Sequence, residues 1–241
     1  MAVWIISDIH GYLDVWKKVK KIIAPKDVVY VLGDCVDRGP QPWTTFKEIY
    51  ADPQAIVFKG NHEDMLVKAA SDYLEGDERW EHRSWSLSAR NGGMRTLEEW
   101  ESDPYRLEWL SKLKKLPTWE SYETNTHIFF LSHAGMNPWT TDDGDIILPS
   151  ENDLLWNRDH FYEDWDTANM DNDITVIHGH TPIPYVAMDL RLDWEGGTLW
   201  YEDNHKACID SGGFFTGEWI LLNLDTLEEI IITLDKENEN V

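Results

Sequence analysis

The chain has 241 residues and a formal net charge of −24 at pH 7, because 45 Asp and Glu residues stand against 21 Lys and Arg. A charge of that sign excludes a basic nucleic-acid-binding module, whose affinity for phosphate backbones depends on clustered cations. Hydrophobic residues form 42% of the chain and include 14 Trp, so we expect a packed core and exclude a disordered acidic chain.

The first ninety residues alternate between strand and helix patterns. Strand-like apolar runs cover residues 3–7, 28–32 and 55–58, and helical spacing of apolar residues covers 12–23, 43–50 and 63–74. In the first of these helices, Trp16, Val19 and Ile23 fall on one face. The βαβαβα order predicts a parallel sheet flanked by helices.

Residues 75–117 differ in character from the segments before them. Four tryptophans lie there among many charges, namely Trp80, Trp85, Trp100 and Trp109. We expect a helical insertion over one edge of the sheet, with these side chains packed inward as a satellite core. The alternative is that one or two indoles stay exposed and contact a substrate.

After about residue 119 the apolar runs are short and strand-like. They cover residues 127–131, 175–178, 185–188, 199–201, 207–209, 219–224 and 230–234. These runs predict a second, largely antiparallel sheet packed on the first, so that residues 1–234 form one α/β domain with two packed sheets and flanking helices. The acidic residues 235–241 are predicted to be a frayed tail.

The sequence also predicts where the protein resides. No apolar run approaches the ~18 residues of a membrane helix, and the first residues lack the basic region and cleavage site of a secretory signal. We therefore expect a cytoplasmic protein without a membrane partner. Cys35 and Cys208 allow one bridge at most and lack zinc spacing, so no disulfide framework is expected. The oligomeric state cannot be read from any pattern.

Polar side chains suited to metal binding follow five of the predicted strands. They are Asp8 and His10, Asp34 and Asp37, Asn61, His133, and His178 with His180. In α/β folds, ligands collect at the carboxyl edge of the sheet. Each motif alone is weak, but together they offer carboxylate, imidazole and amide ligands without a thiolate, which suits Mn, Fe or Zn rather than a structural zinc cage. The number of ligands indicates two ions.

With these motifs in this order, the sequence resembles the calcineurin-like metallophosphoesterases. The resemblance is to the phosphoprotein phosphatase branch, which includes bacterial and phage-lambda-type Ser/Thr phosphatases and symmetrical diadenosine tetraphosphatases, and it runs from Val3 to about Phe214. It implies a four-layer α/β/β/α sandwich of two mixed sheets. It also implies two divalent ions, with Mn as the expected metal and Fe or Zn as alternatives.

The resemblance implies roles for individual residues. Asp8 and His10 would bind one ion, and Asp34 would bridge both. The second ion would also be bound by Asn61, His133 and His180. His180 is preferred over His178 because it stands in the family's Gly-His-Thr pattern, and His178 is interpreted as a strand-end residue near the site.

Four further residues would serve the reaction rather than the metals. His62 matches the general acid and Asp37 the carboxylate that orients it. Arg38 and Arg158 match the guanidinium groups that hold phosphate in a forked geometry. Lys59 stands where many relatives have Arg. Because Lys lacks the forked guanidinium, the resemblance does not decide whether a third side chain contacts the phosphate.

The implied activity is phosphomonoester hydrolysis by a hydroxide held between two metal ions. The leading prediction is a protein Ser/Thr phosphatase, because the acidic surface would attract basic phosphopeptides and repel polyphosphates; other phosphorylated small molecules are possible substrates. The alternative is a symmetrical bis(5'-nucleosyl)-tetraphosphatase on the same metal core, and no motif decides between the two. A non-catalytic binding module is disfavoured because His62, Asp37, Arg38 and all six predicted metal ligands are present together. A nuclease is disfavoured by the charge.

Overall fold

The structure is a computed structural model that describes residues 1–76, 91–136, 149–158, 174–201 and 205–234, with the backbone alone at 139–140 and 146–147. Trp80, Trp85 and the predicted tail 235–241 lie outside the described residues. The extent of the domain, 1–234, therefore stays a prediction.

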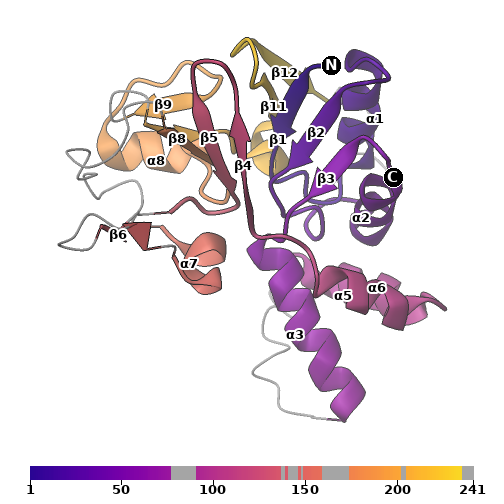
Figure 1. Cartoon of the computed structure of the whole chain (residues 1–241). Helices are drawn as coiled ribbons and strands as arrows, with labels where there is room; N and C mark the ends of the chain where they lie inside the picture. Colours follow the sequence, from indigo (N-terminus) through magenta and orange to yellow (C-terminus); the bar gives the residue numbers. More distant parts are fainter. Residues whose placement is uncertain are drawn as a thin grey trace.

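Two five-stranded sheets form the centre of the molecule (Figure 1). The first has the order β12-β11-β1-β2-β3 and consists of β12 (Glu229–Thr233), β11 (Glu218–Asn223), β1 (Val3–Ile6), β2 (Val28–Val31) and β3 (Ala55–Val57). The second has the order β4-β5-β8-β10-β9 and consists of β4 (Trp119–Glu123), β5 (Ile128–Ser132), β8 (Ile174–His178), β10 (Lys206–Cys208) and β9 (Leu199–Tyr201). A separate two-stranded antiparallel sheet pairs β6 (Trp139–Thr140) with β7 (Ile146–Ile147).

Strand β1 is buried on both faces, which explains its continuous apolar sequence. Because side chains alternate along a strand, Trp4 and Ile6 pack on the helix side of the sheet, while Val3 and Ile5 belong to the core between the two sheets. The inter-sheet core also contains Phe129 and further side chains of the second sheet.

Helices complete the outer layers. Their bounds are α1 (Leu13–Ile22), α2 (Pro42–Ala51), α3 (Asn61–Glu75), α5 (Gly93–Ser102), α6 (Arg106–Leu113), α7 (Glu151–Trp156), α8 (Ile183–Leu190) and α9 (Gly213–Thr216). Figure 1 shows α1 and α2 beside the first sheet, and their apolar faces join the cluster that contains Trp4 and Ile6. On the far side, Leu154 of α7 packs with Phe130 and Val176 of the second sheet. The predicted α/β/β/α layering is confirmed.

Three predictions about the later strands are wrong. Residues 185–188 lie in helix α8, where Ile183, Val186 and Ala187 are buried at helical spacing directly after Pro182. The strands at 219–224 and 230–234 are β11 and β12, which extend the first sheet because β11 pairs antiparallel with β1. The second sheet is not largely antiparallel, since β8 pairs parallel with both β5 and β10.

The described part of the 75–117 segment packs against the first sheet's helices. Trp100 of α5 is fully buried, and the Trp109 ring of α6 lies 6.1 Å from those of Trp43 and Phe46 on α2. Trp100 therefore belongs to the main helix-side core, and the partly buried Trp109 packs against that core rather than forming a separate one. No helix among the described residues is long and apolar enough to cross a membrane.

Candidate metal and phosphate site

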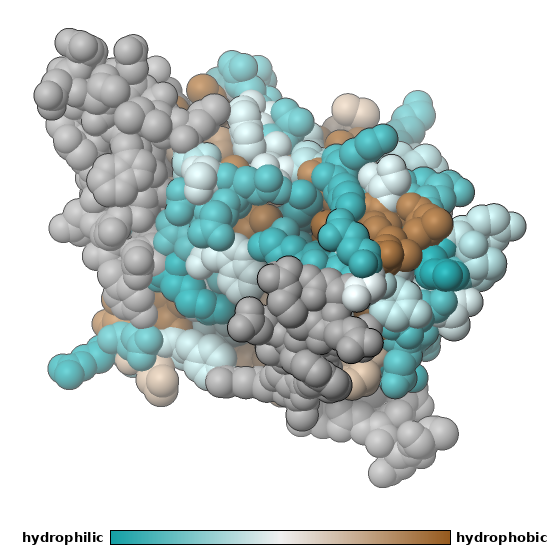
Figure 2. Space-filling view, turned by 90° about the horizontal axis from the view of Figure 1, so that it is seen from below, coloured by the Kyte–Doolittle hydropathy of each residue, from teal (hydrophilic) through white to brown (hydrophobic). Residues whose placement is uncertain are grey.

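The candidate site lies where the strands of both sheets end. Asp8 and His10 follow β1, Asp34 follows β2, His133 follows β5 and His180 follows β8. The carboxyl ends of β1 and β2 point toward the lower part of Figure 1, and Figure 2 views the molecule from that side. Hydrophilic residues cover most of the described surface in Figure 2, so this end of the molecule is suited to a polar substrate.

The backbone of the site is strained. Eight non-glycine residues of the described chain have a positive φ, and six of them are Asp8, His10, Asp34, Asp37, Arg38 and His180. The left-handed conformation costs a non-glycine residue roughly 1–2 kcal/mol. Such outliers persist where a fixed side-chain geometry is needed, so their concentration here marks this edge as the functional site.

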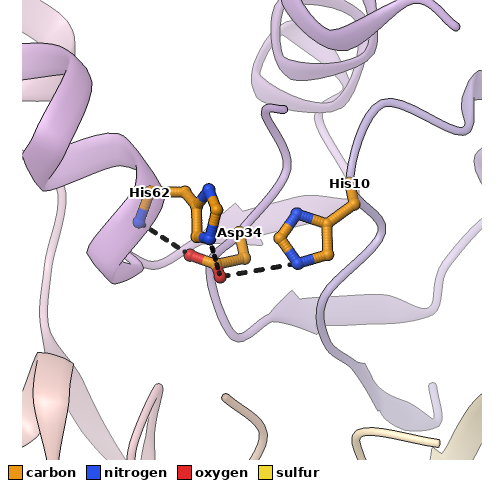
Figure 3. A group of neighbouring side chains, drawn as sticks. All are labelled: His10, Asp34 and His62. Carbon is orange, nitrogen blue, oxygen red and sulfur yellow. Dashed lines mark hydrogen bonds and ion pairs between the residues drawn. The ribbon is translucent and has the colours of Figure 1, made fainter. Parts of the chain in front are cut away.

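The first group of candidate metal ligands is His10, Asp34 and His62 (Figure 3). Oδ2 of Asp34 lies 3.6 Å from Nε2 of His10 and 3.8 Å from Nε2 of His62. Nδ1 of His10 donates to the carbonyl of Val36 at 2.9 Å, which leaves Nε2 as the nitrogen that faces Asp34. Asp8 lies at the edge of this group, with Oδ1 3.8 Å from Nε2 of His10.

The second group contains Asp34, His133 and His180. The amide oxygen of Asn61 lies between the two rings, 2.9 Å from Nε2 of His133 and 3.0 Å from Nδ1 of His180. Oδ1 of Asp34 lies 3.4 Å from Nε2 of His133. Asp34 is thus common to both groups, and its two oxygens face different sides.

The chemistry of these groups fits divalent cations. Burial lowers the pKa of His10, His133 and His180, which keeps the imidazoles neutral, as metal ligands must be. Burial also raises the pKa of Asp34, as expected for a carboxylate that lacks its full complement of positive charge. Nε2 of His180 is buried without a hydrogen-bond partner, which is the state of a ligand atom. The six residues predicted to hold metal therefore lie together at one edge, where two groups of side chains could each hold a metal ion.

Asp37 connects His62 to helix α5. Its Oδ2 lies 2.5 Å from Nδ1 of His62, and its Oδ1 accepts a hydrogen bond from the hydroxyl of Thr96. Burial alone would lower the pKa of His62, but the charges of Asp34 and Asp37 outweigh it and raise the pKa above the ordinary value. Because Nδ1 is held by Asp37, Nε2 is the nitrogen that faces the metal groups.

The predicted phosphate-binding arginines lie at the same site. Arg38 contacts His10 Nε2 at 2.5 Å and His62 Nε2 at 3.2 Å, and Nη1 of Arg158 donates to the hydroxyl of Thr181 at 3.2 Å. Partial burial lowers the pKa of Arg158, while the negative charges of Asp34 and Asp8 act in the opposite direction. Both guanidinium groups thus lie close enough to the site carboxylates, Asp34 above all, to interact with their charge.

The side chains of Lys59 and His178 contact groups other than the candidate metal ligands. Nζ of Lys59 donates to Glu151 on α7 at 2.7 Å. Nε2 of His178 lies 2.8 Å from the Tyr201 hydroxyl and Nδ1 lies 3.0 Å from the carbonyl of Gly179. Burial lowers the pKa of His178 to about 3. His178 thus fits the interpretation as a strand-end residue, and Lys59 anchors the helix that leads to Arg158.

The sequence analysis missed Glu63. Its buried carboxylate accepts hydrogen bonds from the backbone N–H groups of Asp34, Cys35, Val36 and Gly60, over 2.8–3.2 Å. Glu63 therefore fixes the turn after β2 against the start of α3. A Glu at the third position of a helix that reaches back to the residue before the helix is a capping-box signal, visible in the sequence Gly60-Asn61-His62-Glu63.

A family model described as calcineurin-like phosphoesterase matches residues 1–212. The chain belongs to this family. It is therefore a metallophosphoesterase, a hydrolase of phosphoester substrates whose fold implies divalent metal ions.

Two curated relatives align over most of the chain, and both are named bis(5'-nucleosyl)-tetraphosphatase, symmetrical. The relative from Pseudomonas fluorescens (strain SBW25) is 27% identical, and the alignment covers 98% of this chain and 87% of the relative. The relative from Paracidovorax citrulli (strain AAC00-1) is 24% identical over 81% of this chain and 70% of the relative. A solved structure provisionally named a diadenosine tetraphosphatase has a TM-score of 0.64 at 16% identity, covering 97% of this chain and 94% of its own, and this likeness concerns the fold.

Proposed function

We propose that this phosphoesterase is a symmetrical bis(5'-nucleosyl)-tetraphosphatase. The observation that carries the proposal is the alignment of nearly the whole chain with a relative of that name. Addition of one water to the central P–O–P bond of diadenosine tetraphosphate gives two molecules of ADP. The sequence analysis ranked a Ser/Thr phosphatase first, but the aligned relatives support the alternative it carried.

The proposed metal ligands are Asp8, His10, Asp34, Asn61, His133 and His180, with Mn²⁺ as the expected metal. When bound, two such ions would activate water and neutralise charge on the phosphate. The protein side chains do the rest. Arg38 and Arg158 lie where guanidinium groups can hold phosphate oxygens, and Nε2 of His62 is the proton donor for the leaving oxygen because Asp37 holds Nδ1.

The net charge of −24 disfavours long-range attraction of a polyphosphate, as the sequence analysis argued. That effect acts on the rate of encounter and is screened by salt over about 8 Å at physiological ionic strength. The two arginines act at contact distance, where screening is weak. We therefore expect the charge to slow association with diadenosine tetraphosphate at low salt without changing which substrate fits the site.

The test compares kcat/KM for diadenosine tetraphosphate with that for a basic phosphothreonine peptide in Mn²⁺ buffer at 150 mM salt, with products separated by anion-exchange chromatography. We expect the dinucleotide to be preferred and ADP to be the only nucleotide product. AMP together with ATP as products would contradict symmetrical cleavage. A preference for the peptide would restore the Ser/Thr phosphatase prediction.

A further inference from the structure

A row of aromatic rings runs outward from Arg38. The guanidinium carbon of Arg38 lies 4.1 Å from the ring centre of Phe214, and that ring meets Phe215 at 4.8 Å. The Phe215 ring in turn lies 5.6 Å from Tyr185 on α8. Phe215 is 46% exposed and Tyr185 is 47% exposed. The row thus begins at a proposed phosphate contact and ends at the surface.

The short helix α9 that carries two of these rings is fixed to the metal-binding edge. Trp219 follows α9, and its Nε1 donates to the carbonyl of Asp8 at 3.1 Å. Gly213 packs on the indole of Trp219 so closely that a Cβ there would lie 2.1 Å from it, and a Cβ on Gly212 would lie 2.4 Å from the Phe215 ring. The two glycines therefore allow the turn to hold its rings close to the site.

We propose that Phe214, Phe215 and Tyr185 form a platform that stacks the nucleobase of the substrate, an inference that rests on the proposed nucleotide substrate. A nucleotide has a flat base tethered to its phosphates, and exposed aromatic rings bind such bases by stacking. The alkyl side chain of phosphothreonine is short and offers no flat face. Since Arg38 touches both the histidines of the site and Phe214, one ligand can place its phosphate and its base on this row.

The experiment compares AMP with ribose 5-phosphate, which carries a hydroxyl in place of the base, as competitive inhibitors of p-nitrophenyl phosphate hydrolysis by the Mn²⁺-loaded protein. We expect AMP to inhibit wild type about tenfold more strongly, in the range measured for base stacking. Phe215→Ala and Phe215→Leu should both abolish the difference, because Leu keeps apolar area and removes the ring. Tyr105→Ala, which removes a ring 66% exposed at the start of α6, should keep it.

A second measurement does not depend on turnover. Ligand-observed saturation-transfer NMR with AMP should show strong transfer to the adenine protons in wild type and in Tyr105→Ala, and weak transfer in Phe215→Leu. Equal inhibition of wild type by AMP and ribose 5-phosphate would overturn the proposal, as would a preference for AMP that survives Phe215→Leu or disappears in Tyr105→Ala. A protein that prefers AMP but cleaves only phosphopeptides would contradict the proposed function and leave the stacking platform standing.

Discussion

Nδ1 of His62 lies 2.5 Å from Oδ2 of Asp37, and both side chains are buried at the end of the first sheet. The contact fixes the orientation of the imidazole, and it favours the protonated ring because the carboxylate lies beside it. A histidine held in this way can give a proton to a leaving oxygen from its other nitrogen.

For that reason, His62→Asn should lower kcat most for substrates whose leaving group is a strong base. We expect a loss of roughly 10²–10⁴ for an alkyl phosphate, where an alkoxide leaves, and a smaller loss for p-nitrophenyl phosphate, which needs little protonation. Diadenosine tetraphosphate should behave like the second substrate, because a phosphate oxygen leaves. Steady-state kinetics on the three substrates checks this order, and an equal loss on all of them would contradict an acid role.

Metal content should depend on Asp34 more than on any other residue, since it is shared by both candidate ligand groups. We expect Asp34→Ala to retain neither ion, and His180→Gln to lose mainly one. His178→Gln is the matched control, because the His178 nitrogens face Gly179 and Tyr201, and it should keep both. Plasma mass spectrometry after dialysis against Mn²⁺ gives the metal count. Chelation of wild type should abolish activity, and two ions in Asp34→Ala would refute the assignment.

Gly92 should be needed for the position of Arg38. Its φ is +73°, and a Cβ there would lie 2.5 Å from the backbone nitrogen of Arg38. Gly76 has a φ of +68° with open space around it. We expect Gly76→Ala to lower the unfolding free energy by about 1–2 kcal/mol, because alanine is strained in the left-handed conformation. Gly92→Ala should lower it further and should also weaken inhibition by phosphate. Equal unfolding free energies and equal phosphate inhibition in the two variants would show that Gly92 has no effect on the site.

Asp103 should make stability depend on pH. Its buried carboxylate accepts hydrogen bonds from Trp43 Nε1 at 2.9 Å and Lys47 Nζ at 2.7 Å. Burial opposes ionisation, but these bonds outweigh it and lower the pKa of Asp103 below its ordinary value. The stabilisation is therefore complete at neutral pH and is lost as the pH falls through the pKa of the folded state.

Asp103→Asn should accordingly destabilise the protein by about 1–3 kcal/mol at neutral pH. The difference from wild type should shrink as the pH falls below about 4. Urea unfolding followed at several pH values measures it. Asp14→Asn is the control, since Asp14 pairs with Lys17 in an exposed ion pair and should change stability little at any pH. A difference that grows on acidification would reverse the inferred sign.

The sequence could predict which side chains meet at the candidate metal site because the information is local. Asp8, Asp34 and Asn61 each stand within three residues of the end of an apolar run. Parallel strands bring such positions to one edge, so the prediction needs no knowledge of the loops. His133 and His180 could be placed for the same reason, since β5 and β8 also pair in parallel. The roles of Glu63 and Thr96 were harder to predict. Glu63 accepts hydrogen bonds from backbone N–H groups and Thr96 donates one to the carboxylate of Asp37, and these partners are distant in the sequence.

The strand partners could not be predicted because an apolar run does not specify its neighbour. The apolar run at residues 219–224 indicates a buried strand but not its neighbours. Only the structure shows that Ile5 of β1 and Leu222 of β11 pair in one sheet. Residues 185–188 are too few to distinguish a strand from a buried helix by periodicity. Strand β4 has the sequence Trp-Glu-Ser-Tyr-Glu and is mostly exposed, so it offers neither an apolar run nor the alternation typical of a strand.

The pairing of β1 with β11 has a consequence for synthesis of the chain. Strand β1 is synthesised long before β11, yet β11 (residues 218–223) is one of its two neighbours, and Nε1 of Trp219 donates to the carbonyl of Asp8. Until that segment emerges, one edge of β1 has no antiparallel partner and is open to pairing with other nascent chains. We therefore expect the edge that carries the proposed metal ligands Asp8 and His10 to form among the last events of biogenesis. Truncations before residue 218 should yield aggregating protein rather than a smaller, metal-loaded one.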